Sequence, residues 1–135
     1  MRVVYQFSEA RQKMSQIVTQ VEKGGLAVIQ RRGATVMLAT VEEQDALLSG
    51  CYSFAPQVHF SPGIVEIWLP ELEVHGEGAT LSEAEDDLVD AAEEYADEWE
   101  DRLSHAPDHD ARLGWVRRVQ LAQAQGRTRE LLFSS

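Results

Sequence analysis

The sequence has a single cysteine in 135 residues and no long hydrophobic run. Cys51 alone cannot form an internal disulfide, so no cysteine framework is expected. No apolar stretch approaches the roughly 20 residues that a membrane-spanning helix needs. The start of the chain turns polar at once, which is not typical of a secretory signal. These absences predict a cytoplasmic protein from a reducing compartment, with no membrane partner.

Signatures of catalysis and of metal binding are also lacking. There is no glycine-rich nucleotide loop and no nucleophile elbow. The histidines do not have a zinc-binding spacing, and Pro107 interrupts the one pair that is four residues apart. These residues are His59, His75, His105 and His109. The acidic run Glu85, Asp86, Asp87 and Asp90 does not match a calcium loop. We therefore expect no enzymatic activity, no cofactor and no metal.

Basic residues are scarce, with 12 Lys and Arg against 23 Asp and Glu, and they are unevenly placed. Residues 1–40 hold six basic and two acidic residues, a net charge of +4. Residues 41–111 hold twenty acidic residues and one arginine, a net charge of −19. Residues 112–135 hold five arginines and one glutamate, again +4. A basic module joined to an acidic one predicts two partners of opposite charge.

The first 50 residues have the pattern of a β-α-β-β-α module. Residues 3–7 form a β-branched and aromatic run that predicts a strand. Ser8 is expected to cap the helix that follows, and Gly24-Gly25 to end it. Two further strands, 26–31 and 34–40, are expected around an Arg32-Gly33 turn. A capping box of Thr40 and Glu43 then opens a short helix to Leu48.

A linker at residues 51–57 leads to an acidic sheet-plus-helix domain over residues 58–106. Strands are expected at 58–60, 64–69 and 72–75, before a capping box of Thr80 and Glu83. A long helix follows, with an apolar stripe of Leu81, Ala84, Leu88, Ala92, Tyr95, Trp99 and Leu103. Residues 107–135 are expected to form a C-terminal helix at about 109–125, with Leu113, Val116 and Val119 on one side and Gly126 at its end, and an apolar tail. The expected fold class is α+β.

The first module resembles the Phd/YefM family of antitoxins. The resemblance is carried by Ser8-Glu9-Ala10-Arg11, Val21-Glu22-Lys23-Gly24, Ile29 to Ala34 and Val41-Glu42-Glu43. It implies a homodimer that binds operator DNA and represses its own operon. The residues that would face DNA are Arg2, Ser8, Arg11, Arg31 and Arg32, with Arg11 at the start of the first helix. A helix N-terminus offers N–H donors to phosphate, and arginine can read guanine edges or bind phosphate. Alternatively, these arginines only solvate a surface.

The second module resembles the HicB-like antitoxin domain, through Leu69-Pro70-Glu71-Leu72, Gly76-Glu77-Gly78 and Thr80-Leu81-Ser82-Glu83-Ala84. The resemblance implies a small sheet covered by a helix that neutralises a toxin. HicB-like proteins usually carry their DNA-binding segment after this domain, whereas here a Phd-like module precedes it. The identity of the toxin therefore stays open.

An acidic helix can present carboxylates to the basic, RNA-holding groove of an RNase toxin, and complementary charge speeds association. The residues expected to bind the toxin are Glu83, Asp87, Asp90, Glu94 and Trp115. Trp115 is chosen because tryptophan is enriched at binding hot spots, whereas Trp99 is expected in the core. A simple solvated helix face is the alternative.

The leading hypothesis is a type II antitoxin that neutralises a toxin, expected to be an RNase, and represses its own operon. A second hypothesis is a stand-alone dimeric transcriptional regulator whose acidic domain senses a ligand or oligomerises. A third makes the acidic half a nucleic-acid mimic aimed at a basic protein. The C-terminal arginines are expected to fold back onto the acidic helix, although DNA contact is also open.

Overall fold

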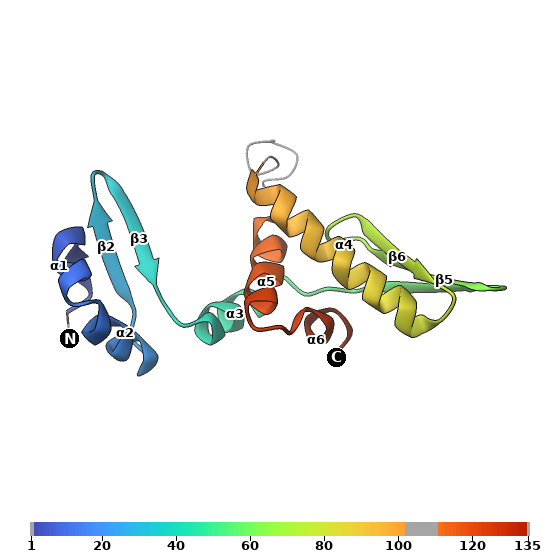
Figure 1. Ribbon diagram of the computed structural model, residues 1–135, viewed down its shortest axis with the longest axis horizontal. Helices are drawn as coiled ribbons and strands as arrows, with labels where there is room; N and C mark the ends of the chain where they lie inside the picture. Colours follow the sequence, from blue (N-terminus) through green and yellow to red (C-terminus); the bar gives the residue numbers. More distant parts are fainter. Residues whose placement is uncertain (1, 102–110, 135) are drawn as a thin grey trace. The chain divides into compact units, whose positions relative to one another are not determined.

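The chain divides into two compact units, Met1–Leu47 and Leu48–Ser135, and each contains a three-stranded sheet with helices (Figure 1). The computed structural model describes residues 2–101 and 111–134. Leu103, His105, Pro107 and His109, which the sequence analysis singled out, lie outside the described residues. The mixed composition of helices and strands confirms the α+β class.

The N-terminal unit has the element order that the sequence predicts, except that the first helix is broken. Its elements are β1 Val4–Gln6, α1 Phe7–Gln12, α2 Met14–Glu22, β2 Ala27–Arg31, β3 Ala34–Leu38 and the start of α3 Val41–Ser49. The sheet order is β1-β2-β3, with β1 parallel and β3 antiparallel to β2. A parallel pair needs a crossover connection, which α1 and α2 supply.

The core of this unit lies between the two helices and one face of the sheet. Its buried side chains are Tyr5, Ala10, Ile17, Val21, Ala27 and Ile29. On the opposite face, Val4, Val28 and Met37 form one cross-strand row. Val4 and Met37 are 47% and 52% exposed. An apolar row left open on a small sheet marks a surface suited to a partner.

Ser8 does not cap the first helix, contrary to the prediction. The helix begins at Phe7, directly after the extended Gln6, so Ser8 lies inside the first turn. The predicted single helix is also interrupted at Lys13, whose N–H bonds to the carbonyls of Glu9 and Ala10. Met14 and Val18 have the helical spacing of the buried Ala10, Ile17 and Val21, but each is 38% exposed.

The predicted turns of this unit are confirmed. Gly24 ends α2 with φ +98°. At the hairpin, Arg32 has φ +46° and Gly33 φ +81°, and two consecutive positive φ values are what a two-residue type I′ turn requires. The Glu43 N–H donates to Thr40 Oγ1 at 3.2 Å and opens α3 as the capping pattern predicts.

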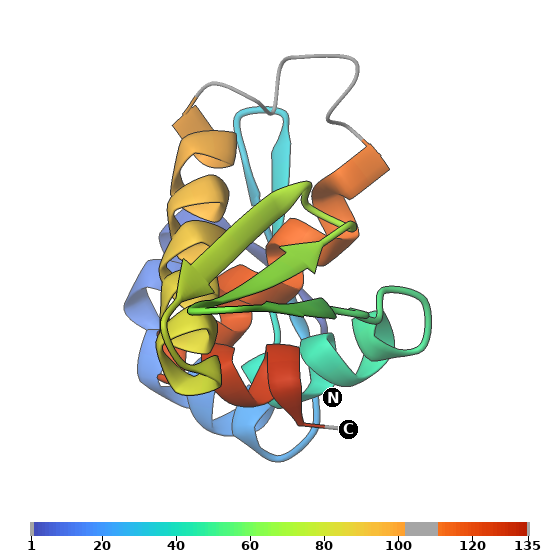
Figure 2. The same ribbon diagram turned by 90° about the vertical axis from the view of Figure 1, so that its right-hand side faces the viewer.

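The C-terminal unit is built on an antiparallel sheet, β4-β5-β6, with α4 packed on one face (Figure 2). Its elements are β4 Gln57–Ser61, β5 Ile64–Leu69, β6 Val74–Gly78, α4 Leu81–Asp101, α5 Leu113–Ala124 and α6 Thr128–Phe133. The core combines Ile67 and Leu69 of β5 with Leu88 of α4, Val119 of α5 and Leu132 of α6. The predicted C-terminal segment therefore shares one core with the sheet-plus-helix segment.

Two predictions in this unit are wrong in detail. The third strand is Val74–Gly78 rather than 72–75, because Leu72 turns into the core and Glu73 takes φ +54°. Leu81 and Leu113 were expected on apolar stripes but are 41% and 44% exposed. The apolar tail is a helix, α6, whose Leu132 is buried. Trp99 is buried and Gly126 ends α5 at φ +67°, both as predicted.

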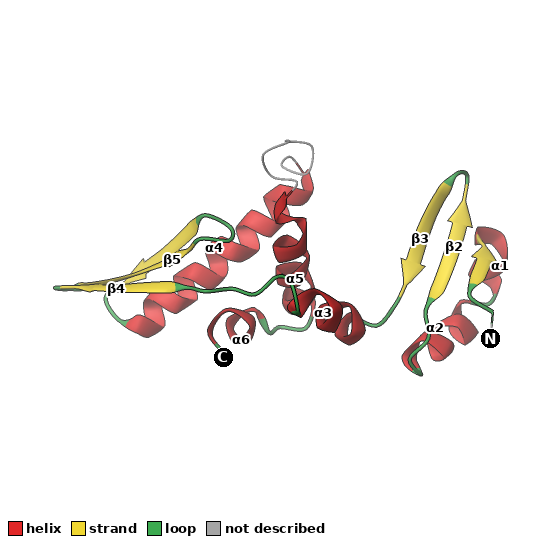
Figure 3. Cartoon of the chain, turned by 180° about the vertical axis from the view of Figure 1, so that it is seen from behind, coloured by secondary structure: helices red, strands yellow, loops and turns green. Residues whose placement is uncertain are grey.

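The segment at residues 50–56 has neither helix nor strand, and it packs against α5 on its way to β4 (Figure 3). The rings of Tyr52 and Trp115 meet edge to face, with centroids 4.9 Å apart. Trp115 Nε1 donates to the Ser53 carbonyl at 3.0 Å, and Arg118 donates to the Tyr52 carbonyl at 3.0 Å. These contacts fasten the predicted linker to α5.

Candidate functional site

The β2–β3 hairpin brings three of the five residues predicted to bind DNA to one end of the first sheet. The Arg31 guanidinium lies 4.5 Å above the centroid of the Phe7 ring. Ser8 follows Phe7 directly, and Arg32 occupies the turn. A side-chain hydrogen bond of 2.9 Å from Gln6 to Gln30 joins the two strands beneath them. We call Ser8, Arg31 and Arg32 the hairpin end.

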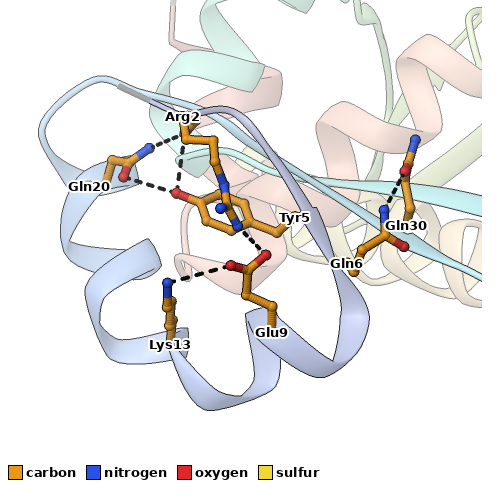
Figure 4. Close-up of polar contacts among 7 residues, drawn as sticks. All are labelled: Arg2, Tyr5, Gln6, Glu9, Lys13, Gln20 and Gln30. Carbon is orange, nitrogen blue, oxygen red and sulfur yellow. Dashed lines mark hydrogen bonds and ion pairs between the residues drawn. The ribbon is translucent and has the colours of Figure 1, made fainter.

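Arg2 lies at the other end of β1, in a polar cluster of its own (Figure 4). Its guanidinium is 4.4 Å from the centroid of the Tyr5 ring and forms an ion pair with Glu9. Lys13 Nζ is 3.5 Å from the same carboxylate. The Arg2 carbonyl accepts hydrogen bonds from Tyr5 and Gln20. Arg2 is therefore engaged within the fold and is not part of the hairpin end.

Arg11 is predicted at the start of the first helix, but it lies in the last turn of α1. The difference arises because α1 ends at Gln12 and is only six residues long. Arg11 is exposed and, like Arg32, has no ion-pair partner among residues 2–101 and 111–134. Both side chains are thus available to an anionic partner.

Glu9 is a residue that the sequence analysis missed as a functional candidate. Glu9 and Lys13 are four residues apart, a helical spacing from which an ion pair can be predicted. The contact between Glu9 and Arg2 has no such spacing, because Arg2 lies in the segment before β1. Hydrogen bonding from the Arg2 guanidinium, with Lys13 assisting, lowers the pKa of the Glu9 carboxyl below its ordinary value of 4.5. Glu9 therefore pairs with Arg2 and Lys13, which makes these two cations less available to another anion.

The lowered pKa predicts how pH acts on this cluster. A depressed carboxyl pKa stabilises the folded state above the unfolded pKa, and that stabilisation is lost as pH falls through the folded pKa. The free energy of unfolding of Glu9→Gln is therefore expected to fall less steeply than that of the wild type between about pH 5 and pH 3. Urea unfolding followed by circular dichroism measures the difference. The control is Glu22→Gln on α2, which removes a carboxylate that lies outside this cluster; equal slopes for both variants would contradict the role of Glu9.

Counted over the compact units, the charge contrast is carried mainly by the C-terminal unit. Residues 1–47 hold six basic and five acidic residues, because Glu42, Glu43 and Asp45 of α3 belong to this unit. Residues 48–135 hold eighteen acidic residues and six arginines. The N-terminal unit is therefore close to neutral, and its cations act locally rather than through a large net charge.

The four carboxylates predicted to bind a toxin lie along one exposed stripe of α4, but two of them have structural contacts. Asp87 Oδ2 accepts from the Glu77 N–H at 2.9 Å, which ties α4 to β6. Glu83 accepts from the Ala79 N–H at 2.9 Å, while its own N–H donates to Thr80 Oγ1 at 3.2 Å. Asp90 and Glu94 are exposed further along the same stripe. These two are the better candidates for contact with a basic partner.

Of the C-terminal arginines, Arg129 neutralises carboxylates of α4, and these lie outside the stripe. Arg129 forms ion pairs with Glu85, at 2.8 Å, and with Asp86. Arg112 donates to the Tyr95 hydroxyl at 2.9 Å and pairs with Glu73. For Arg129 this is the fold-back onto the acidic helix that the sequence analysis expected. Beside the stripe, a hollow of about 330 Å³ between β6 and α4 is bordered by Glu73, His75, Glu94 and Glu98.

Trp115 is half-buried, and its indole N–H is already used by the Ser53 carbonyl. Its clearest role is to hold the segment at residues 50–56. No group of three His, Cys, Asp or Glu side chains in the described ranges is arranged to hold a metal ion. Within the same ranges, no helix is long and apolar enough to cross a membrane.

Residues 1–133 match a family model, PHD_like, described as "Antitoxin of toxin-antitoxin, RelE / RelB, TA system". The chain therefore belongs to this family of antitoxins of toxin–antitoxin systems. Its fold is similar to a 1.80 Å crystal structure of an antitoxin from a proposed toxin/antitoxin system of Syntrophomonas wolfei subsp. wolfei. The TM-score is 0.74 and the identity 15%, over 98% of this chain and 97% of that one. A search of curated proteins finds no match.

Proposed function

We propose that this antitoxin neutralises a cognate toxin, an RNase, through its C-terminal unit, and represses its own operon in the cytoplasm by binding operator DNA through its N-terminal unit. Membership of the antitoxin family implies a toxin partner and favours a regulatory rather than an enzymatic role. One observation supports assigning toxin binding to one unit and DNA binding to the other. The C-terminal unit carries the exposed carboxylate stripe of α4, whereas Arg11 and Arg32 of the N-terminal unit have no ion-pair partner among the described residues.

The toxin-binding half of the proposal is supported by where the negative charge lies. Arg129 pairs with Glu85 and Asp86 of α4, whereas Asp90 and Glu94 lie on the exposed stripe of the same helix. An RNase must hold a polyanion and therefore presents positive charge. Complementary charges across such an interface speed association and suppress wrong partners. We place the toxin on this stripe, with Glu83 and Asp87 contributing charge while they fasten the helix.

The DNA-binding half is supported by the hairpin end and Arg11. Arg31 is held over Phe7, so it is preorganised, and Arg32 projects from the turn. Arginine forks match phosphate oxygens and guanine edges. Two copies of the N-terminal unit would pack the open row of Val4, Val28 and Met37 against each other, which makes a homodimer with two hairpin ends. Arg2, which is bound to Glu9, contributes less in this arrangement.

Removing charge from the α4 stripe tests the toxin surface. Asp90→Asn with Glu94→Gln is expected to slow toxin association about tenfold at low salt, because rim charges act mainly on the association rate. Surface plasmon resonance at two salt concentrations measures the effect. The matched control is Glu66→Gln with Glu77→Gln, which removes the same charge from the sheet face opposite α4. Equal effects of the two pairs would contradict a specific surface.

A growth-rescue experiment tests the proposal as a whole. The small open reading frame adjacent to this gene is induced alone and then together with this chain. Growth arrest alone and recovery with the full chain are expected. Arrest that the chain does not relieve, or no arrest at all, would reject the neutralising function and favour a stand-alone transcriptional regulator.

A further inference from the structure

The outer strand β4 of the second sheet is open to pairing. It is the first strand in the order β4-β5-β6, and all five of its residues are exposed. One edge of β4 bonds to β5, and no strand among the described residues pairs with the other. The unpaired N–H and C=O groups of such an edge are a template for another strand.

The side chains of β4 extend the apolar face of this sheet past its covering helix. Val58 lies opposite Ile67 and Phe60 opposite Val65, so all four are on the face where α4 packs. Ile67 and Val65 are buried beneath α4, yet Val58 is 44% and Phe60 66% exposed. The apolar row therefore reaches the open edge without a cover.

The sequence of β4 fits a second copy of itself better than it fits a basic partner. Gln57-Val58-His59-Phe60-Ser61 contains no Asp, Glu, Lys or Arg, in a unit with eighteen acidic residues. It also lacks the lysine, proline or bulge that usually protects an edge strand. In an antiparallel pairing centred on His59, Val58 of each copy faces Phe60 of the other, and Gln57 faces Ser61. Apolar residues then meet apolar residues, and polar residues meet polar ones.

We propose that two copies of this antitoxin pair β4 with β4, antiparallel, about a two-fold axis at His59. The product is a continuous six-stranded sheet with both α4 helices on the same face. Val58 and Phe60 of the two copies cover one another between those helices. This isologous contact is separate from the open face of the N-terminal sheet, and it leaves the Asp90–Glu94 stripe uncovered by β4.

Disulfide trapping in the full-length chain tests the register. With Cys51→Ser as background, His59→Cys places one thiol opposite its own copy across the axis. Mild oxidation with diamide is expected to link His59→Cys into a covalent dimer at least about tenfold faster than Val58→Cys, whose opposite residue is Phe60. Mixing Val58→Cys with Phe60→Cys should give the mixed dimer. Equal rates for His59→Cys and Val58→Cys alone would overturn the proposal.

A charge placed on the edge tests whether the link reports a real interface. Phe60→Lys added to His59→Cys is expected to slow the linking at least about tenfold, since lysine on an edge strand blocks pairing. His75→Lys, on the other face of the sheet, should leave the rate unchanged; circular dichroism checks the fold of each variant. Linking that is insensitive to Phe60→Lys would overturn the proposal. So would failure of His59→Cys to link while Phe60→Lys abolishes growth rescue, which would assign the edge to a toxin strand.

Discussion

Replacing Gly76 with alanine is expected to destabilise the C-terminal unit by about 3 kcal/mol or more, since overpacking against backbone leaves nothing free to move. A Cβ at this position would lie 2.6 Å from the Ala84 carbonyl oxygen and 2.8 Å from Leu88 Cα, and close to the Leu88 backbone nitrogen. These atoms belong to the N-terminal part of α4, which begins at Leu81, so relief requires moving this end of the helix away from β6. Urea unfolding followed by tryptophan fluorescence measures the loss, because Trp68, Trp99 and Trp115 all lie in this unit.

The matched control is Gly50→Ala, in the segment before β4. No atom lies within 4 Å of a Cβ built at Gly50, and its φ is not positive. Its effect is expected to stay within about 0.5 kcal/mol, which is usual for a surface substitution. Gly76→Ala should also abolish growth rescue at a temperature where Gly50→Ala rescues fully. If both variants unfold at the same urea concentration, then the close packing of β6 on α4 is wrong.

Gly76 also shows where prediction from the sequence stopped. Gly76-Glu77-Gly78 has the local composition of a turn, so the strand was ended too early. Gly76 is needed because Ala84 and Leu88 of α4, which follow much later in the chain, pack too closely for any Cβ. Such a contact has no local signature. By contrast, the boxes at Thr40–Glu43 and Thr80–Glu83 depend on neighbours within one turn, and both helix starts were predicted correctly.

The candidate sites follow the same division between local and distant contacts. The stripe of Glu83, Asp87, Asp90 and Glu94 is a matter of helical period, so its placement on one face could be predicted. That Asp87 is tied to the Glu77 N–H could not, because the partner lies on a strand. The resemblance to the Phd/YefM family places Arg2 with the DNA-facing arginines. Its contact with Glu9 and the Tyr5 ring depends on how the chain enters β1.

Neutralising the hairpin end is expected to have the largest effect on operator binding. Arg31→Gln with Arg32→Gly removes two cations from each copy, and glycine keeps the positive φ of the turn. In a dimer four contacts are lost, so affinity should fall at least about 100-fold at physiological salt, and the slope of log K against log salt should decrease by about 3 to 4. Fluorescence anisotropy with the upstream operator at several salt concentrations measures both quantities.

Two further variants show whether the loss belongs to the hairpin end or to net charge in general. Lys23→Ala removes an exposed cation from the end of α2 in the same unit, and affinity should change less than about threefold. Glu9→Gln removes the carboxylate that pairs with Arg2 and Lys13. The operator affinity of this variant should rise, and its salt slope should increase, to the extent that these two cations reach phosphate. A hairpin-end variant that binds the operator with unchanged affinity and salt slope would reject this surface as the DNA contact. Because we propose that neutralisation depends on the C-terminal unit, the same variant should still rescue growth, which separates repression from toxin binding.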